Sequence, residues 1–267
     1  MSKIVPDELW SIVEPLLPAA KPRRFRYPGR KPVDNRVALS VILFVLKSGI
    51  AWEDVPQEMG CCGMAAWNKL HQWQAAGVWP ELHRVLLEKL HQADTVNWER
   101  ALVDSSSVRA TQGGDGTGPN PTDRAKAGSK HHVLSDANGL PLAQRATAAN
   151  VPDIKQLEPL VEAIPPLQGR RGRPRRRPQK VQGDRGYDSQ PHRDRLRQKG
   201  IQPLLAKRRK PHGSGLGKYR WPIERTLSWF HQRRRLRIRD DKSQPIHQAF
   251  LDIAAAMICF HALIAFI

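Results

Sequence analysis

The first third of the chain repeats apolar residues with the period of an α-helix. One helix is predicted after Asp7 and Glu8, because acidic residues favour a helix N-terminus. A second, apolar on nearly all sides, is predicted between Asp34, which suits an N-cap, and Gly49, which suits a C-terminal stop. Residues 1–97 are therefore predicted to form a helical region.

Two helical segments around a glycine-containing turn follow in this region. A short helix is predicted over 53–59, a longer one from about 64 to Gly77, and a last one from Pro80 to about 90. The first two resemble a helix-turn-helix, whose second helix reads base edges. Polar side chains on that helix suit DNA, and the predicted contacts are Asn68, Lys69 and Gln72. A plain helical bundle with a polar surface would show the same pattern.

From residue 98 the pattern changes to short apolar runs. A strand is predicted at 101–103, ending at Asp104, and two strands over 130–148 are joined by a turn at 136–139. The elements predicted next are a helix from Asp153, a strand at 181–182 before Asp184, a polar helix at 191–199, a strand at 201–205, a helix that begins near Glu224 and an apolar helix from Phe250. This order predicts an α/β or α+β domain over 98–267, with helices packed on a mixed sheet.

The charge balance narrows the class of partner. The 267 residues include 44 Lys and Arg against 25 Asp and Glu, a net charge of +19. Such a charge favours a polyphosphate partner, although a ribosomal or nucleoid protein without catalysis would be basic for the same reason. Two basic, glycine-containing stretches, 169–180 and 207–218, cannot bury apolar surface and are predicted to be mobile loops.

Cysteine usage and the apolar C-terminus indicate the compartment. The chain has three cysteines, two of them adjacent, which gives neither a disulfide framework nor a zinc pattern. No secretory signal is recognised, and the apolar stretch 250–267 carries Asp252 and His261 and is short for a membrane span. A buried helix and a cytoplasmic, nucleoid-associated protein without a membrane segment are predicted.

Three acidic residues stand out by their context. Asp104 and Asp184 follow apolar strands, and Glu224 lies at the start of an amphipathic helix, so the three are predicted to converge at one edge of the sheet. Magnesium prefers oxygen ligands, and two ions roughly 4 Å apart activate the attacking and leaving oxygens of a phosphodiester. A lone Asp or Glu is usually a capping or solvated group. A protein that binds phosphate rarely has carboxylates next to its substrate unless a cation lies between them. The strongly basic composition therefore favours a metal-binding role for these three residues.

The residues around these carboxylates form distinctive motifs: Gly-Arg-Lys-Pro at 29–32, Trp-Glu-Asp-Val-Pro at 52–56, Gly-Ser-Lys-His-His at 128–132, Gly-Asp-Arg-Gly-Tyr at 183–187 and Arg-Trp-Pro-Ile-Glu-Arg-Thr at 220–226. Together they resemble the bacterial insertion-sequence transposases of the DDE class, in insertion-sequence family five, nearly from end to end. Asp104, Asp184 and Glu224 match the three acidic positions of that family. Its Tyr before the third carboxylate is Gly217 here, and its last basic position is His231.

The resemblance implies a fold, a reaction and partners. The implied fold is α+β, with an N-terminal helical DNA-binding region followed by a ribonuclease-H-like mixed-sheet catalytic domain. The implied reaction is cleavage at transposon ends and strand transfer, with two Mg²⁺ ions, for which Mn²⁺ can substitute, held by Asp104, Asp184 and Glu224. The implied partners are double-stranded DNA, as terminal repeats and target, and further copies of the chain, as a homodimer or higher oligomer that synapses two ends.

Basic side chains near the carboxylates are interpreted as DNA contacts. These are Lys130, His132, Arg185, Arg220, Arg225, Arg233 and Arg234. For His132 a structural role is the alternative. A solvated helix face is the alternative for the arginines after Glu224. Trp221 and Trp229 are interpreted as core residues, with stacking on an unpaired base as the alternative.

Two other functions fit parts of the same pattern. A nuclease built on the same core would hydrolyse DNA without strand transfer. A transposase-derived regulator would bind DNA without catalysis, and the presence of all three carboxylates argues against it.

Overall fold

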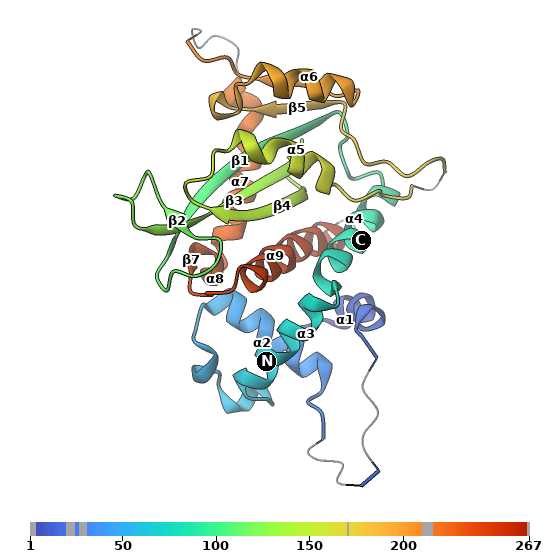
Figure 1. Cartoon of the computed structure of the whole chain (residues 1–267). Coiled ribbons are helices and arrows are strands. Elements are labelled where there is room, and N and C mark those ends of the chain that lie inside the picture. Colours follow the sequence, from blue (N-terminus) through green and yellow to red (C-terminus); the bar gives the residue numbers. More distant parts are fainter. Residues whose placement is uncertain (1–3, 20–24, 27–30, 170, 210–215, 266–267) are drawn as a thin grey trace.

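The computed structural model describes residues 4–19, 25–26, 31–169, 171–209 and 216–265. A mixed sheet with packed helices forms one part of the molecule, and the N-terminal helices lie together beside it (Figure 1). The N-terminal elements are α1 (Asp7–Val13), the 3-10 turn η1 (Glu14–Leu16), α2 (Asn35–Ser48), the 3-10 turns η2 (Trp52–Asp54) and η3 (Gln57–Met59), α3 (Gly63–Ala75) and α4 (Val78–Gln92).

Local capping signals place α2 as predicted. The Asp34 carboxylate accepts a hydrogen bond from the Val37 backbone N–H at 3.0 Å, and Gly49 ends the helix with a left-handed φ of 72°. The prediction of one helix over 53–59 is wrong, because the segment forms two separate 3-10 turns, η2 and η3, with Pro56 between them. Proline has no N–H to donate and disfavours the helical conformation of the residue before it.

The sheet has the order expected of a ribonuclease-H-like core. Its strands are β1 (Arg100–Ala110), β2 (Gly118–Pro119), β3 (Ala127–Asp136), β4 (Pro141–Ala148), β5 (Lys180–Gly183), β6 (Gln202–Leu205) and β7 (Ile238–Arg239). β4, β3 and β1 pair antiparallel, and β1, β5 and β6 continue in parallel. The parallel strands are linked through α5 (Ile154–Ala163) and α6 (Gln190–Gln198). The predicted α+β class is confirmed.

Two predicted elements are longer than expected. β1 runs on to Ala110 instead of ending at Asp104, because β3 pairs with it from Ala101 to Arg109. The helix predicted to begin near Glu224 is α7 (Leu216–His231), so that carboxylate lies in the middle of the helix. Two further helices complete the chain, α8 (Arg234–Arg237) and α9 (Gln244–Ile264).

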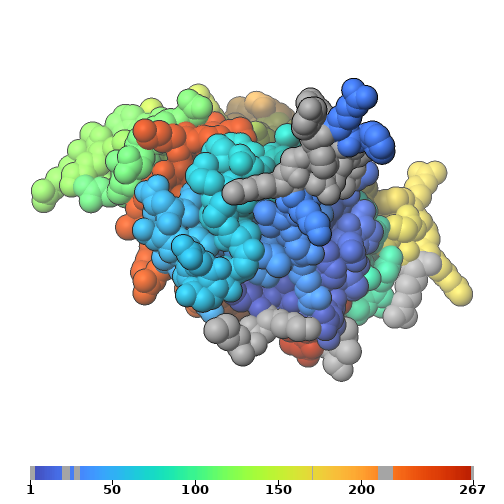
Figure 2. Space-filling view, turned by 90° about the horizontal axis from the view of Figure 1, so that it is seen from below, coloured from blue at the N-terminus to red at the C-terminus, as the bar shows by residue number. Residues whose placement is uncertain are grey.

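The basic stretch predicted as a mobile loop over 169–180 is partly tied down. Leu167 is fully buried and exchanges two backbone hydrogen bonds of 2.8 Å with Arg175. The segment projects at one side of the face formed by the N-terminal helices, where it is drawn in yellow (Figure 2). Of the second stretch, residues 210–215 lie outside the described residues, and from 216 onward it is already α7.

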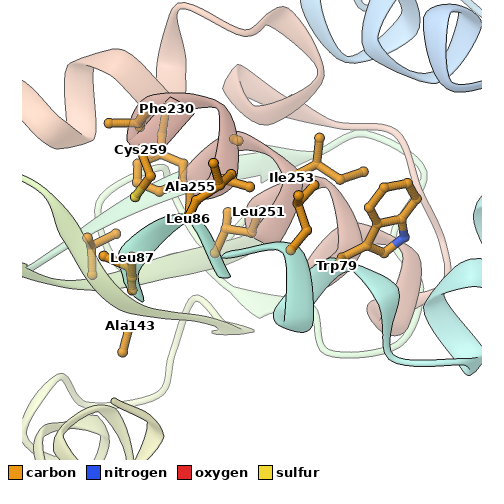
Figure 3. Packing of buried hydrophobic residues seen from close by; sticks show 14 of the residues in the cluster. Trp79, Leu86, Leu87, Ala143, Phe230, Leu251, Ile253, Ala255 and Cys259 are labelled. Carbon is orange, nitrogen blue, oxygen red and sulfur yellow. The ribbon is translucent and has the colours of Figure 1, made fainter. Parts of the chain in front are cut away.

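One apolar core joins the helical region to the sheet. Trp79 and Leu86 of α4 are fully buried and pack against α9, which contributes Leu251 and Ile253 (Figure 3). α9 is long and apolar enough to cross a membrane, but 72% of its most apolar window is buried inside the structure. The predicted buried helix is confirmed, and the domain boundary at residue 97 stays a prediction because residues on both sides share this core.

Candidate active site

Asp104 of β1 lies level with Asp184, the residue that directly follows β5. Leu102 of β1 pairs with Gln182 of the parallel strand β5, and the two carboxylates come two residues further along each chain. Burial raises the pKa of Asp104, and the charge of Asp184 raises it further. The structure therefore brings two of the three predicted carboxylates together.

Arg220 of α7 balances the charge of Asp104, which is partly buried. Its guanidinium Nη2 lies 2.8 Å from Asp104 Oδ2, and the Ser105 backbone N–H donates to Asp104 Oδ1 at 2.8 Å. The charge of Arg220 lowers the pKa of Asp104 and so opposes the effect of burial. The guanidinium predicted to contact phosphate is thus paired with a carboxylate in this structure.

Asp184 is held by the turn that follows it. Its Oδ1 accepts the Gly186 backbone N–H at 2.8 Å, which fixes the 3-10 turn η4 (Arg185–Tyr187). Gly183 just before it has no room for a side chain, since a Cβ atom there would lie 2.9 Å from Val103 Cγ1. The Gly-Asp-Arg-Gly-Tyr motif is therefore explained by close packing of β5 on β1 and by the turn that orients Asp184.

Glu224 is exposed on α7, one turn after Arg220, and residues four apart lie on the same side of a helix. Within the described part of the chain, no group of three or more His, Cys, Asp or Glu side chains lies close enough to hold a metal ion. The structure thus does not gather Glu224 with Asp104 and Asp184 into a three-carboxylate metal site, and its role as a ligand stays a prediction.

The two gathered carboxylates nevertheless fit a magnesium ion. Mg²⁺ in phosphoryl-transfer sites is bound by one or two carboxylates, with water and substrate phosphate supplying the other oxygens. Asp104 and Asp184 provide that donor set at one place on the sheet. Both oxygens of Asp104 now accept hydrogen bonds, so a cation would take the place of the Arg220 contact.

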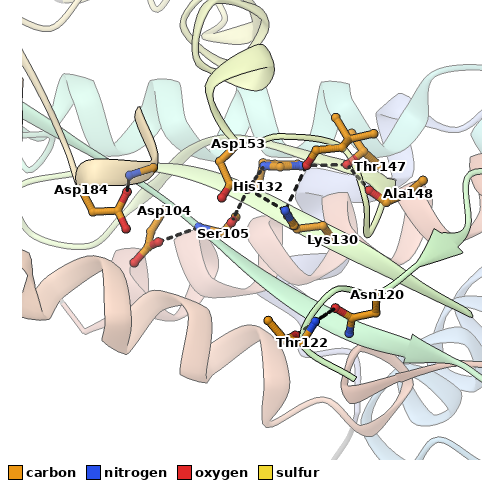
Figure 4. Close-up of polar contacts among 12 residues, drawn as sticks. Asp104, Ser105, Asn120, Thr122, Lys130, His132, Thr147, Ala148, Asp153 and Asp184 are labelled. Carbon is orange, nitrogen blue, oxygen red and sulfur yellow. Dashed lines mark hydrogen bonds and ion pairs between the residues drawn. The ribbon is translucent and has the colours of Figure 1, made fainter. Parts of the chain in front are cut away.

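A fourth carboxylate, Asp153, was predicted only as a helix start. Figure 4 shows it between Ser105 of β1 and the side chains of Lys130 and His132 on β3. The Ser105 hydroxyl donates to Asp153 Oδ1 at 2.7 Å, and Lys130 Nζ lies 3.0 Å from the same oxygen. The sequence gives no local signal for this contact, because it joins residues 48 positions apart.

Two residues predicted to contact DNA, His132 and Lys130, point inward in this structure, and their part in DNA binding stays a prediction. His132 is fully buried, and its Nε2 forms a 2.8 Å hydrogen bond with Thr147 Oγ1. Burial lowers the pKa of His132 to about 4, so it is neutral at physiological pH. The Lys130 side chain is only 13% exposed, and besides Asp153 it donates to the Val151 carbonyl at 3.0 Å. Both side chains point inward because alternate residues of β3 face the helix α5, not solvent.

The remaining predicted DNA contacts lie at or near the surface. Asn68, Gln72 and Arg234 are exposed, whereas Lys69, Arg185, Arg225 and Arg233 are partly buried. Burial lowers the pKa of Arg233 to about 10, which leaves it charged. Their part in DNA binding stays a prediction.

Trp221 is not a core residue. It is 54% exposed, and the Arg225 guanidinium carbon lies 4.5 Å from its ring centroid and 4.6 Å from that of Trp229. Trp229 is partly buried and packs against the core, as predicted. The interpretation of Trp221 as core is wrong because α7 turns that side of the helix to solvent.

Comparisons with known proteins agree on one family. Residues 99–259 match the family described as "Transposase DDE domain", and residues 5–83 match "Putative transposase of IS4/5 family". Over 147 residues the chain is 59% identical to the "Putative transposase for insertion sequence element IS402" of Burkholderia cepacia, which covers 55% of this chain and 70% of that protein. Over 119 residues it is 56% identical to the "Insertion element IS402 uncharacterized 16.2 kDa protein" of the same organism, covering 44% of this chain and 81% of that protein.

Similarity to solved structures is distant. A pre-cleavage Mos1 transpososome has 10% sequence identity and a TM-score of 0.28, with 92% of this chain and 81% of that chain covered. A Mos1 mariner paired-end complex with Mn has the same identity and coverage and a TM-score of 0.26. Scores this low carry no inference, so the family rests on the sequence matches. The DDE-domain family matches residues 99–259 of this 267-residue chain, and the IS4/5-family match covers most of the N-terminal part. The protein therefore belongs to the DDE transposases of the IS4/IS5 family.

Proposed function

We propose that this transposase cuts DNA at the ends of an IS402-like element and joins the freed 3′ ends to target DNA. The observation that supports this most strongly is the pair of level carboxylates, Asp104 on β1 and Asp184 directly after β5, in a chain with a net charge of +19. Hydrolysis and strand transfer are both in-line attacks on a phosphodiester, so one site serves both steps.

Mg²⁺, or Mn²⁺ in its place, would be held by Asp104 and Asp184, with Glu224 proposed as the third ligand and two ions in all. When bound, the ions activate the attacking oxygen and stabilise the leaving oxygen. Arg220 favours the ionised form of the partly buried Asp104 before the ions arrive, since its guanidinium is 2.8 Å away. A cation that displaces this contact would leave the guanidinium beside the substrate phosphate, where Arg makes charge-assisted hydrogen bonds.

The DNA partner is proposed to lie along α3 and the sheet edge. Asn68 and Gln72 are exposed on α3, the second helix of the predicted helix-turn-helix, and amide side chains suit adenine edges in the major groove. Two element ends must be held at once for joining, so a homodimer or higher oligomer is proposed as the active assembly. A cytoplasmic, nucleoid-associated location is part of the same proposal, because the proposed substrate is bacterial DNA.

The experiment is incubation of the protein with DNA that carries the element ends, in Mg²⁺, followed by a denaturing gel. Cleavage at the element boundary supports the proposal. A second substrate with a pre-cut 3′ end separates a transposase from a nuclease, because only the transposase joins that end to target DNA. Binding without any cut product in Mg²⁺ or Mn²⁺ would leave the regulator as the better account.

A further inference from the structure

Asp153 occupies a helix N-cap without acting as a cap. It precedes α5, but its own backbone is helical, with φ −58° and ψ −37°, and its side chain accepts no hydrogen bond from the helix. Asp34, at the same place before α2, does accept one, from Val37. Asp is favoured at N-caps because its oxygen pairs with free N–H groups of the first turn. The Asp153 carboxylate therefore has another partner.

The partners of Asp153 are Ser105 and Lys130, and Ser105 in turn contacts Asp104. Asp153 Oδ1 accepts the Ser105 hydroxyl at 2.7 Å and lies 3.0 Å from Lys130 Nζ. The Ser105 backbone N–H in turn donates to Asp104 Oδ1 at 2.8 Å. Ser105 is thus held from both sides, since its main chain contacts Asp104 on one face of β1 and its hydroxyl contacts Asp153 on the other (Figure 4).

The other oxygen of Asp153 faces the turn that carries Asp184. A Cβ atom built on Gly186 would lie 3.0 Å from Asp184 Oδ1 and 3.6 Å from Asp153 Oδ2. Tyr187 at the end of this turn is fully buried. Burial and then the charges of Asp153, Asp104 and Asp184 raise its pKa. Asp153 and Asp184 therefore both lie beside the same turn.

We propose that Asp153 is a positioning residue for the phosphodiester chemistry: it links β1 to β3 through Ser105 and Lys130, lies beside the turn η4, and thereby fixes the orientation of Asp104 and Asp184. The inference rests on the proposed function for its chemical consequence, but not for the contacts themselves. Asp153 acts on Asp104 through Ser105 and on Asp184 by its place beside Gly186, and it need not touch DNA. Partners that orient ligand side chains typically matter about 10- to 100-fold in affinity or activity.

A structural role alone makes a different prediction. If Asp153 served α5 as an ordinary cap, serine would replace it well, because Ser is among the best N-cap residues. A serine hydroxyl is too short to reach both Ser105 and Lys130, and it carries no charge. Asp153→Ser therefore keeps the capping chemistry and removes the tether. Asp153→Asn keeps the shape and one acceptor but removes the ion pair with Lys130, and it serves if the serine variant unfolds.

The first arm of the test needs no DNA. Amide hydrogen exchange is measured by mass spectrometry on the full-length wild type, Asp153→Ser, Asp153→Asn and Asp34→Ser. The proposal expects peptides that contain Ser105 and Gly186 to lose protection in both Asp153 variants and to keep it in Asp34→Ser. Unchanged exchange of these peptides overturns the proposal, whether or not the protein cuts DNA.

The second arm measures cleavage of element-end DNA and binding to the same DNA. The expected result is a cleavage rate about 10- to 100-fold lower in Asp153→Ser, with binding affinity and thermal midpoint near wild type. Cleavage at the wild-type rate, despite lost protection, also overturns the proposal. If the wild type itself does not cut while protection is lost in the variants, the positioning of the carboxylates stands and the proposed function fails.

Discussion

At the scale of single residues, the site depends on charges that are buried and then balanced. Asp104 is desolvated, which raises its pKa, and Arg220 offsets this with an ion pair of 2.8 Å. Removal of a partner from such a pair leaves an uncompensated charge, and the group responds by taking up a proton. Loss of Arg220 is therefore expected to change the pKa of Asp104, whereas loss of Asp104 removes the carboxylate itself.

Arg220→Gln is expected to shift the acid limb of the cleavage rate toward higher pH. Without the guanidinium, the pKa of Asp104 rises further, so the carboxylate is protonated over a wider acid range. Rates on end DNA between pH 5.5 and 8.5 test this, with Arg197→Gln as a control, since that exposed arginine lies on α6 and pairs with Asp194. An acid limb that does not move would mean that Arg220 does not govern the ionisation of Asp104.

Some residues of the site could be recognised from the sequence, and the contacts of others could not. Asp104, Asp184 and Arg220 were recognised from motifs that carry their own local context. The contacts of His132 and Asp153 were not foreseen, because their partners, Thr147 and Ser105, come from other elements. A His-His pair next to a lysine suggests phosphate contact in sequence, and only the pairing of β3 shows that His132 points inward.

At the scale of elements, capping residues predicted the ends of helix α2 correctly, whereas the length of strand β1 was not predicted. α2 was predicted from Asp34 and Gly49, which act within one turn of the helix ends. β1 extends past Asp104 because β3 pairs with it, and that pairing joins residues up to 35 positions apart, such as Ala101 and Asp136. Contacts this distant leave no periodic signal in a single sequence.

The packing of α9 on β4 contains a buried carboxylate that costs stability. Burial raises the pKa of Asp252 to about 6 although Gln144 and Gln248 donate to it at 2.7 and 2.8 Å. The folded state then binds the proton more tightly than the unfolded chain, so this group's contribution falls as pH rises from about 4 to about 6. Above that range the ionised form is retained at a constant penalty.

Asp252→Asn is therefore expected to stabilise the protein by about 1–3 kcal/mol at pH 8 and to have little effect at pH 4. Asparagine keeps an oxygen that accepts both amide hydrogen bonds and has no charge to bury. Urea unfolding at the two pH values measures the difference. A destabilised variant at pH 8 would show that the carboxylate is needed in its charged form.

The arginine-rich segment is expected to set part of the salt dependence of DNA binding. Arg171 and Arg173 are exposed, whereas Arg176 and Arg177 donate to the backbone carbonyls of Glu162 and Lys199. Replacing only Arg171 and Arg173 by Ser should flatten the slope of log affinity against log salt by about 2, since each phosphate contact contributes about 0.9. Fluorescence anisotropy at several salt concentrations measures the slope, with equal effects expected on end DNA and unrelated duplexes. An unchanged slope would mean that these arginines are only solvated.

At the scale of the whole molecule, one core joins the helical region to the catalytic sheet. Leu86 and Leu87 of α4 are fully buried in the cluster that includes Leu251 of α9. Burial of one such side chain contributes about 1.5–3 kcal/mol, so loss of α9 would expose more than a small helical fragment can tolerate. The general architecture was predicted from the order of elements, but this shared core was not, because both helices are apolar and the sequence does not say which faces meet.

A fragment of residues 1–97 is accordingly expected not to fold alone, and sequence recognition has to be tested in the full chain. Asn68→Ala with Gln72→Ala should reduce the preference for end DNA over unrelated duplexes by about 1–3 kcal/mol for each lost base contact. Circular dichroism of the fragment and competition binding of the full-length variant check the two parts. A folded fragment would contradict the shared core, and an undiminished preference would contradict the role assigned to α3.

The central claim is that Asp104 is needed for metal-dependent DNA cleavage, as a ligand of the metal ions, and not for DNA binding. Its most direct test compares the wild type and Asp104→Asn on element-end DNA in Mg²⁺, with cleavage and binding measured on the same protein preparation. The account predicts that the variant loses cleavage and binds end DNA about as tightly as the wild type, because a lost carboxylate removes transition-state stabilisation but no phosphate contact. Cleavage by Asp104→Asn at the wild-type rate would contradict it.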